Sequence, residues 1–281
     1  TLMWGATFVV VRDSLAVLAP AAVVTTRFGA ASALFALVML ARWRRIGRAT
    51  LVGGLVTGVA TAGGYLFQAV GLMSTSAGSS AFLTSAGTLL AGLLAWPILR
   101  QRPGPWLALG LLVALLGSAL LGLRGGWTLG VGEAWTLLGA AAYALQIVGL
   151  AYWAPRGDAL AITGIQAAVA ALCTVPFAGD LPAQLGALDG PGWARIAYLV
   201  VCGSVAAPLL QVLAQQRLSP GRIGLLFALE PVFALAFALG VGGERFVPRW
   251  WAGAALILGA VVMVEWREAR RDAARTPTAI V

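Results

Sequence analysis

Apolar stretches long enough to cross a lipid bilayer recur from one end of this chain to the other. A helix needs about 20 predominantly apolar residues to span a hydrocarbon core about 30 Å thick. Hydrophobic residues make up 60% of the 281 positions and charged residues only 10%, with a mean hydropathy of +0.90. That balance leaves too little polar surface for a water-soluble globule. The sequence therefore predicts an all-α polytopic membrane protein.

Clusters of Arg, Pro, Gly and Asp divide the chain into ten predicted transmembrane helices. The first is too short to cross a membrane, and the chain opens with Thr1. We therefore expect upstream residues that complete this helix, since the run WGATFVVV has no small-residue cleavage site typical of a signal peptide. The ten predicted spans are 1–11, 20–41, 51–73, 78–99, 106–123, 131–152, 159–177, 193–215, 222–241 and 250–266.

The basic residues lie unevenly on the two sides of this ten-helix arrangement. The formal net charge is +9, and all 19 basic residues are Arg. With the N-terminus in the cytoplasm, five arginines fall outside and Arg27 falls within a span. This excess follows the positive-inside rule, so both termini are expected in the cytoplasm of a bacterial cell with the chain in its inner membrane. The 13 inner arginines are Arg42, Arg44, Arg45, Arg48, Arg100, Arg102, Arg156, Arg217, Arg222, Arg267, Arg270, Arg271 and Arg275. The charge thus predicts contact with anionic lipid headgroups and not with nucleic acid.

The chain also carries a weak internal repeat, a frequent feature of transporters. An offset of 143 residues aligns GYLFQAVGLMSTSAG (64–78) with APLLQVLAQQRLSPG (207–221) without a gap. An offset of 139 aligns the earlier parts, so that Trp4 meets Tyr143 and Arg27 meets Gln166. Each half contains five spans, an odd number, so the second copy enters the membrane from the opposite side. We therefore predict two inverted-topology five-helix repeats, residues 1–124 and 130–268, followed by a basic cytoplasmic tail, residues 269–281.

Polar side chains recur on one face of two helices that the repeat relates. Spacings of 4, 3 and 4 place four residues on one face of the third span: Thr61, Tyr65, Gln68 and Leu72. Their counterparts on the eighth span are Ser204, Pro208, Gln211 and Gln215. Two such faces are expected if symmetry-related helices line one central cavity. The alternative is that these side chains hydrogen-bond to neighbouring helices.

Aromatic and amide side chains supply further candidates for a solute site. Tyr143 and Gln146 lie one turn apart in the sixth span, and Trp4 aligns with Tyr143. Aromatic walls with a few amide groups suit a small amphipathic solute. The competing interpretation is that Trp4 and Tyr143 belong to the packed core.

The third span is rich in glycine, so parts of its surface carry no side chains. Gly54 and Gly58 have the GxxxG spacing that allows close backbone approach between membrane helices. We expect these positions to pack against a neighbouring helix and not to contact solute.

Two charged residues are predicted at membrane depth. Arg27 lies about seven residues into the second span and Glu230 about eight into the ninth, where insertion of a charge costs about 2.5–3.5 kcal/mol. Three interpretations of Glu230 remain open: a protonated structural hydrogen-bond donor, an ion pair with Arg27, or a cavity group that takes up a proton or a substrate ammonium. Pro231 predicts a kink, because it cannot donate to the carbonyl of Phe227.

The residue types needed for metal binding or catalysis are scarce. The chain has no His and no Lys, and its two cysteines, Cys173 and Cys202, fall in apolar segments where a thiol acts as a small hydrophobe. The aspartates lie in predicted loops or tails. We expect no metal site, no cofactor, no disulfide and no enzymatic activity. An ion channel is disfavoured, since no segment resembles a selectivity filter.

The most recognisable motif runs from the end of the eighth span through the ninth. The stretch QVLAQQRLSPGRIGLLFALEPVFALAFALGVGGERF (211–246) contains AQ, SP, EPVFA and GE in that order. This order resembles the second repeat of the EamA type in the drug/metabolite transporter superfamily. WGATFVVV, with TRF at 26–28, resembles the first repeat. One departure is Gln101, which stands in the first half where the second half has Glu244.

The resemblance implies a ten-helix carrier of small metabolites that works by alternating access. Within that family the expected solutes are amino acids or related compounds, moved in the export direction through a cavity between the repeats. The alternative is a carrier or channel-like facilitator for another solute class, such as a nucleotide sugar, a drug or an ion. The expected partners are the small-molecule solute and the lipid bilayer, and the sequence leaves the oligomeric state open, a monomer being compatible with it.

Overall fold

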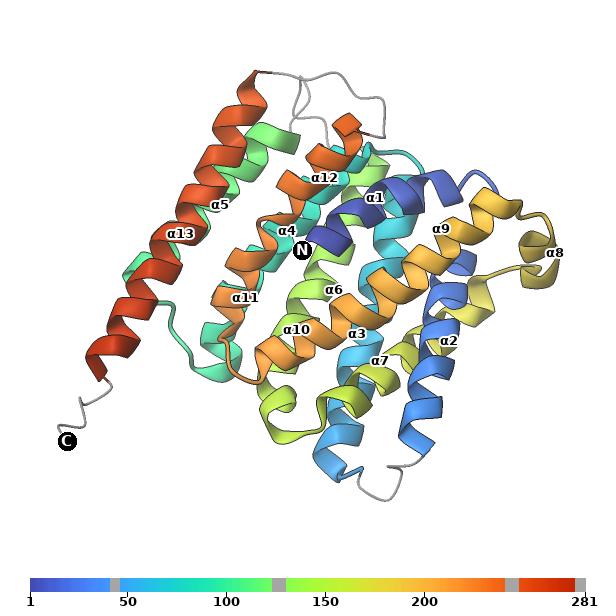
Figure 1. Ribbon diagram of the computed structural model, residues 1–281, viewed down its shortest axis with the longest axis horizontal. Coiled ribbons are helices and arrows are strands. Elements are labelled where there is room, and N and C mark those ends of the chain that lie inside the picture. Colours follow the sequence, from blue (N-terminus) through green and yellow to red (C-terminus); the bar gives the residue numbers. More distant parts are fainter. Residues whose placement is uncertain (41–45, 123–129, 241–247, 276–281) are drawn as a thin grey trace.

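Every regular element is a helix in the part of the chain that the computed structural model describes, residues 1–40, 46–122, 130–240 and 248–275 (Figure 1). The first half contains α1 (Leu2–Ser14), α2 (Pro20–Met39), α3 (Arg48–Leu72), α4 (Ala77–Leu99) and α5 (Pro105–Gly122). The second half contains α6 (Val131–Trp153), α7 (Ala159–Thr174), α8 (Leu181–Gly186), α9 (Gly190–Val200), α10 (Ala207–Gln215), α11 (Pro220–Phe227), α12 (Glu230–Gly240) and α13 (Arg249–Arg275). The predicted all-α fold class is confirmed.

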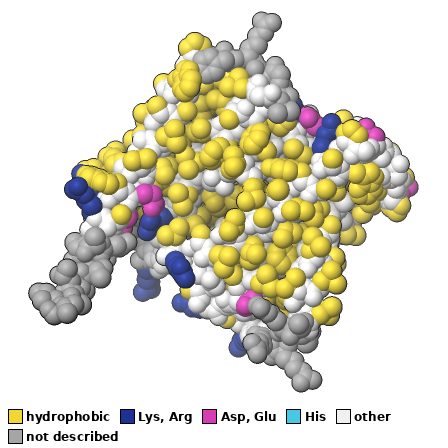
Figure 2. All heavy atoms as spheres, in the orientation of Figure 1, with side chains coloured by type: hydrophobic (Ala, Val, Ile, Leu, Met, Phe, Trp, Pro, Cys, Tyr) yellow, Lys and Arg dark blue, Asp and Glu magenta, His cyan; other side chains and the backbone are white. Residues whose placement is uncertain are grey.

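Seven of the described helical segments are long and apolar enough to cross a membrane. They are Pro20–Met39, Arg48–Leu72, Ala77–Leu99, Val131–Arg156, Ala159–Phe177, Gly190–Gln215 and Pro220–Phe237. Each coincides with a predicted span. Helix α5 is apolar but shorter, and neither α1 nor α13 is among the seven. Figure 2 shows the resulting surface, a broad apolar expanse with charged side chains confined to its edges.

The eighth and ninth predicted spans are not single regular helices. The eighth consists of α9, a π-helical segment η4 (Val201–Ala206) and α10. The ninth is interrupted at Ala228 and Leu229, between α11 and α12. Proline lacks an N–H and fits best in the first turn of a helix, where no N–H partner is needed, and α12 begins at Glu230 with Pro231 second. The kink predicted at Pro231 is therefore a helix break just before it.

Some sequence expectations concern residues at the ends of helices. Helix α13 continues to Arg275, so it extends into the predicted tail at 269–281. Glu244 lies outside the described residues. The same holds for the arginines Arg42, Arg44, Arg45, Arg124 and Arg245.

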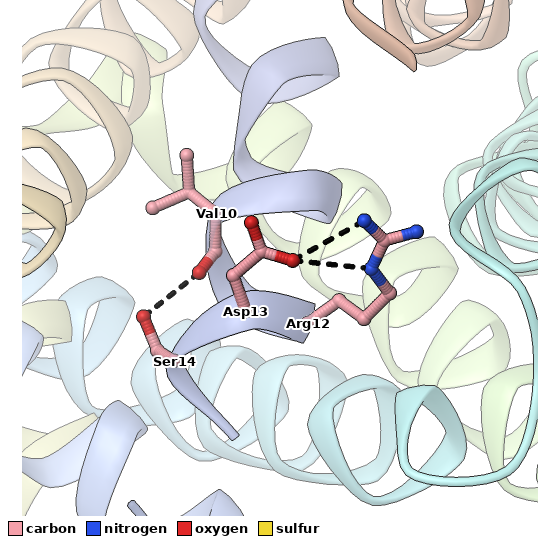
Figure 3. A network of polar contacts seen from close by, with 4 residues as sticks. All are labelled: Val10, Arg12, Asp13 and Ser14. Carbon is pink, nitrogen blue, oxygen red and sulfur yellow. Dashed lines mark hydrogen bonds and ion pairs between the residues drawn. The ribbon is translucent and has the colours of Figure 1, made fainter. Parts of the chain in front are cut away.

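A polar cluster closes α1 (Figure 3). The Asp13 carboxylate accepts hydrogen bonds from Arg12 Nε at 3.3 Å and from Arg12 Nη2 at 3.2 Å. Ser14 Oγ donates to the Val10 carbonyl at 2.8 Å, one turn earlier. Because the two charged side chains are 33% and 38% exposed, their pairing contributes little to stability.

Helix packing brings the two halves of the chain into close contact. Helix α3 packs on α6 and α7, α2 packs on α7, and α1 packs on α12, while α5 and α13 lie together at one edge (Figure 1). The α3–α7 crossing depends on glycine. A Cβ atom at Gly54 would lie 2.6 Å from the Cβ of Ile165, and one at Gly58 would lie 2.7 Å from the Cβ of Val169. The GxxxG pair therefore packs closely against its neighbour, as expected.

We expect Gly54→Ala to destabilise the protein, because the new methyl group would overlap Ile165. Overpacking of this kind costs about 1–3 kcal/mol. Thermal unfolding of the purified protein in detergent measures the effect. Gly63→Ala is the matched control on the same helix, since its Cβ would meet nothing nearer than Ala142 Cβ at 3.5 Å. Equal losses of stability in the two variants would contradict a close α3–α7 crossing.

Candidate functional site

A central cavity lies among helices from both halves of the chain. Its space free of protein atoms is about 620 Å³, including the open mouth. Its aromatic lining consists of Trp4, Phe28, Tyr65, Tyr143 and Phe227. Its amide and hydroxyl lining consists of Thr7, Thr61, Gln68, Thr84, Gln146, Thr163, Gln166, Ser204 and Gln211. Glu230 adds the one carboxyl group of the described wall, completed by Ile147, Ala167 and Pro208.

The predicted site residues divide between the cavity wall and the layer behind it. Six predicted solute-binding residues line the cavity: Trp4, Tyr65, Gln68, Tyr143, Gln146 and Gln211. Glu230 lines it as well. Gln215, Arg27 and Pro231 are not part of the described wall.

The aromatic side chains form two edge-to-face groups. The Tyr65 ring lies 4.7 Å from the Phe28 ring and 5.2 Å from the Tyr143 ring, between centroids. Trp4 and Phe227 meet at 5.1 Å with their planes 88° apart. Such pairs are favourable beyond the area they bury, so they stabilise these largely apolar walls.

Gln68 lies at the centre of a hydrogen-bonded group on one side of the cavity. Its Nε2 donates to Thr84 Oγ1 at 2.9 Å, and its Oε1 accepts from the Tyr143 hydroxyl at 3.3 Å. These bonds connect α3 to α4 and α6. The amide is therefore both part of the wall and a link between helices.

Gln211 belongs to a second group, in which two amides face each other. Gln211 Nε2 donates to Gln146 Oε1 at 2.9 Å, with the reverse bond at 3.4 Å. It also donates to Gln215 Oε1 at 3.0 Å, and Gln215 Nε2 donates to the Ile147 carbonyl at 2.7 Å. Gln215, predicted to line the cavity, instead lies behind Gln211 and attaches it to α6. The reason is that α10 ends at Gln215, where it has passed the cavity and reached the α6 backbone.

Glu230 occupies the start of α12, beside the break in the ninth span. Its side chain is 7% exposed and lines the cavity. Across the described chain it makes no side-chain hydrogen bond, and no ion pair joins it to Arg27. The Arg27–Glu230 ion pair, one of the three interpretations left open for Glu230, is thus not formed among the described residues.

Arg27 is buried one side chain behind the wall, with 1% of its surface exposed. Its Nε donates to Ser204 Oγ at 2.7 Å. The guanidinium carbon lies 4.7 Å from the centre of the Tyr65 ring and 5.3 Å from that of Phe28. Its Nη2 has no hydrogen-bond partner among the residues described. The positive charge is therefore held by a hydroxyl and two aromatic rings.

The π-helical segment η4 explains how Trp4 is positioned. The Ala207 N–H bonds to the Cys202 carbonyl, five residues earlier. In the same pattern residue 208 would bond to Gly203, but Pro208 has no N–H. Trp4 Nε1 donates to that Gly203 carbonyl at 3.2 Å. The sequence signal for this arrangement was Pro208, which points to a free carbonyl without identifying its donor.

Comparisons with known proteins agree with this architecture. The model of the EamA-like transporter family matches residues 1–123 and 130–266. An uncharacterized transporter of Archaeoglobus fulgidus is 27% identical over 266 residues, which cover 95% of this chain and 83% of that protein. A protein of known crystal structure has a TM-score of 0.71 at 20% identity, over 95% of this chain and 96% of its own. At that identity the structural likeness concerns the fold alone.

We expect Trp4→Phe to lose about 1–3 kcal/mol of stability, because it leaves the buried Gly203 carbonyl unpaired. Pro208→Ala restores a backbone N–H that lets the helix satisfy its own carbonyls. In a Pro208→Ala background the Trp4→Phe change should therefore cost less. Denaturant unfolding of the two single variants and the double variant measures this coupling. Strictly additive losses would show that the indole does not replace the missing donor.

Proposed function

We propose that this chain, which belongs to the EamA-like transporter family, is a secondary transporter that carries amino acids or related small metabolites through the central cavity by alternating access. Its family assigns it to solute transport across a membrane. The solute class, the export direction and the alternating-access mechanism are proposed. So are its place in a bacterial inner membrane and the cytoplasmic location of both termini.

The observation that carries the proposal is the pairing of cavity residues between the halves. Each of the seven described lining residues of the first half has a lining counterpart at an offset of 139 or 143. The pairs are Trp4 with Tyr143, Thr7 with Gln146, Phe28 with Ala167, Thr61 with Ser204, Tyr65 with Pro208, Gln68 with Gln211, and Thr84 with Phe227. This pairing supports a pseudo-twofold axis through the cavity. Inverted repeats with a shared midplane site are typical of carriers that open alternately to the two sides.

The contacts between helices follow the same relation between the two halves. The packing of α3 on α6 and α7 has its counterpart in the packing of the α9–η4–α10 segment on α1 and α2. The packing of α4 on α6 corresponds to that of α12 on α1, and the α2–α7 and α5–α13 pairs correspond to themselves. This correspondence supports two five-helix repeats and a total of ten spans when α1, α5 and α13 are included.

The cavity chemistry favours a small amphipathic solute. Its walls are aromatic, and its polar groups are amides, hydroxyls and the carboxyl group of Glu230. Amides orient polar ends by hydrogen bonds, aromatic faces accept apolar groups, and a carboxylate attracts an ammonium. Amino acids combine these features.

Reconstituted protein is expected to move radiolabelled amino acids or related metabolites across liposome membranes. Gln68→Ala and Gln211→Ala should each lower the initial rate severalfold, because each removes an amide from the cavity wall. Gln101→Ala is the control, since that amide is exposed and is not among the residues that line the cavity. Normal rates in both cavity variants, at normal expression, would mean that these amides only join helices.

Glu230 is the leading carboxyl group for proton coupling, because it lines the cavity without a hydrogen-bond partner in the described chain. We expect Glu230→Gln to abolish the response of transport to a pH gradient while preserving exchange of solute without a gradient. Glu133→Gln is the matched control outside the cavity, where the new amide oxygen can still accept from Thr75. An unchanged pH response in Glu230→Gln would exclude the proton role.

A further inference from the structure

We propose that Arg27 determines specificity: its positive charge, which has no ion-pair partner in the described chain and lies directly behind the cavity wall, favours solutes that carry an anionic group. The inference rests on the transport function proposed above and deepens it. Arg27 acts here as a positioning and selecting residue that shapes the field inside the cavity, since its side chain is not part of the described wall.

Arg27 has no counter-ion among the described residues. Arg27 is 1% exposed, and no carboxylate of the described chain lies within ion-pair distance of it. A hydroxyl bond and contacts with ring faces stabilise the guanidinium but bring no negative charge. A buried cation in a weakly polarisable interior acts on its surroundings over several ångströms. The adjoining cavity therefore experiences a positive potential on this side.

The counterpart of Arg27 at an offset of 139 is Gln166, a neutral amide. Gln166 Nε2 donates to Thr61 Oγ1 at 3.4 Å, while Arg27 Nε donates to Ser204 Oγ at 2.7 Å. Thr61 and Ser204 are themselves counterparts at an offset of 143. Both halves thus make the same kind of connection, from a long side chain to a hydroxyl on a cavity helix.

The hydrogen bond to a cavity helix and the positive charge are therefore two distinct properties of Arg27. In the second half a neutral amide makes the connection, so a charge is not needed to join the helices. Burying a guanidinium costs much more than burying an amide. The free Nη2 shows that local hydrogen bonds do not offset that cost completely. An anionic group of a bound solute is the partner that the cavity can supply.

The guanidinium packs closely against the cavity wall. The hydroxyl and the two rings that hold it all belong to lining residues, namely Ser204, Phe28 and Tyr65. On its other side a Cβ atom at Gly203 would collide with Nη2 and would lie 3.0 Å from Thr7 Cγ2. Glycine at this point of η4 therefore leaves just the space that the guanidinium fills, and the charge keeps a fixed position relative to the cavity.

The test is the ratio of the affinities for an amino acid, which has a carboxylate, and for its amide, in which a neutral carboxamide replaces the carboxylate. The probes are L-leucine with L-leucinamide and L-phenylalanine with L-phenylalaninamide, measured by equilibrium binding to the purified chain in detergent. Wild type should prefer the acids by about tenfold, as expected for one charge acting through protein. Arg27→Gln, which copies the arrangement at Gln166, should bring the ratio close to one. Arg27→Lys should retain most of the preference, because it retains the charge.

A purely structural role for Arg27 would change the affinities for acid and amide equally, and that result would overturn the proposal. A wild-type chain without preference for either acid would also overturn it. Gln166→Glu covers the case in which Arg27→Gln fails to fold: it keeps Arg27 and adds a negative charge to the wall, so the acid preference should fall. An unchanged ratio in this variant would count against the proposal.

Transport is measured separately in proteoliposomes. Acid-selective binding that depends on Arg27, without movement of any solute, would refute the proposed transport function and leave the role of Arg27 intact. Transport together with an acid-to-amide affinity ratio that Arg27→Gln does not alter would refute the role of Arg27 and leave the transport function intact.

Discussion

Backbone hydrogen bonding in lipid is the constraint on which this structure depends. The hydrocarbon core offers no water to pair a free N–H or C=O, so irregular backbone survives there only where protein or a cavity satisfies it. The two interruptions of membrane-spanning helices described above both meet this condition. At η4 the indole of Trp4 occupies the carbonyl that Pro208 leaves free. At the α11–α12 break the irregular turn is flanked by Phe227 and Glu230, both on the cavity wall. The cavity and the irregular backbone therefore lie together for one physical reason.

Much of the fold could be predicted because membrane crossing is a local property of sequence. Seven predicted spans have matching helices, since length and apolarity are decided within each segment. Gly54 and Gly58 showed a close crossing through their spacing alone. The backbone conformation around each proline could not be predicted. Pro208 and Pro231 both remove a donor, yet one lies after a π-helical segment and the other after a break, because the outcome depends on which distant group pairs with the free carbonyl.

The cavity could be predicted only where its residues form a polar stripe. Gln68 and Gln211 stood out on otherwise apolar helices, whereas Phe28 and Ala167 look like ordinary core residues until the helices are packed. Gln215 lies on the predicted face but one turn beyond Gln211. At that point α10 contacts the backbone of α6 instead of the cavity. For Arg27 the sequence indicated its depth in the membrane and left Glu230 open as an ion-pair partner. A hydroxyl and two rings are unusual surroundings for a guanidinium, and the sequence did not indicate them.

The contact between α4 and α6 at Gly87 has a consequence for the proposed cycle. Gly87 is the counterpart of Glu230 at an offset of 143, and a side chain there would collide with Ala140 on α6. The first half therefore has no room for the acid that the second half carries. Two identical repeats would give inward-facing and outward-facing states of equal energy. In the proposed alternating-access cycle, an acid at one helix crossing and a glycine at the other would make these two states differ in energy. One orientation would then be preferred even with equal solute on both sides.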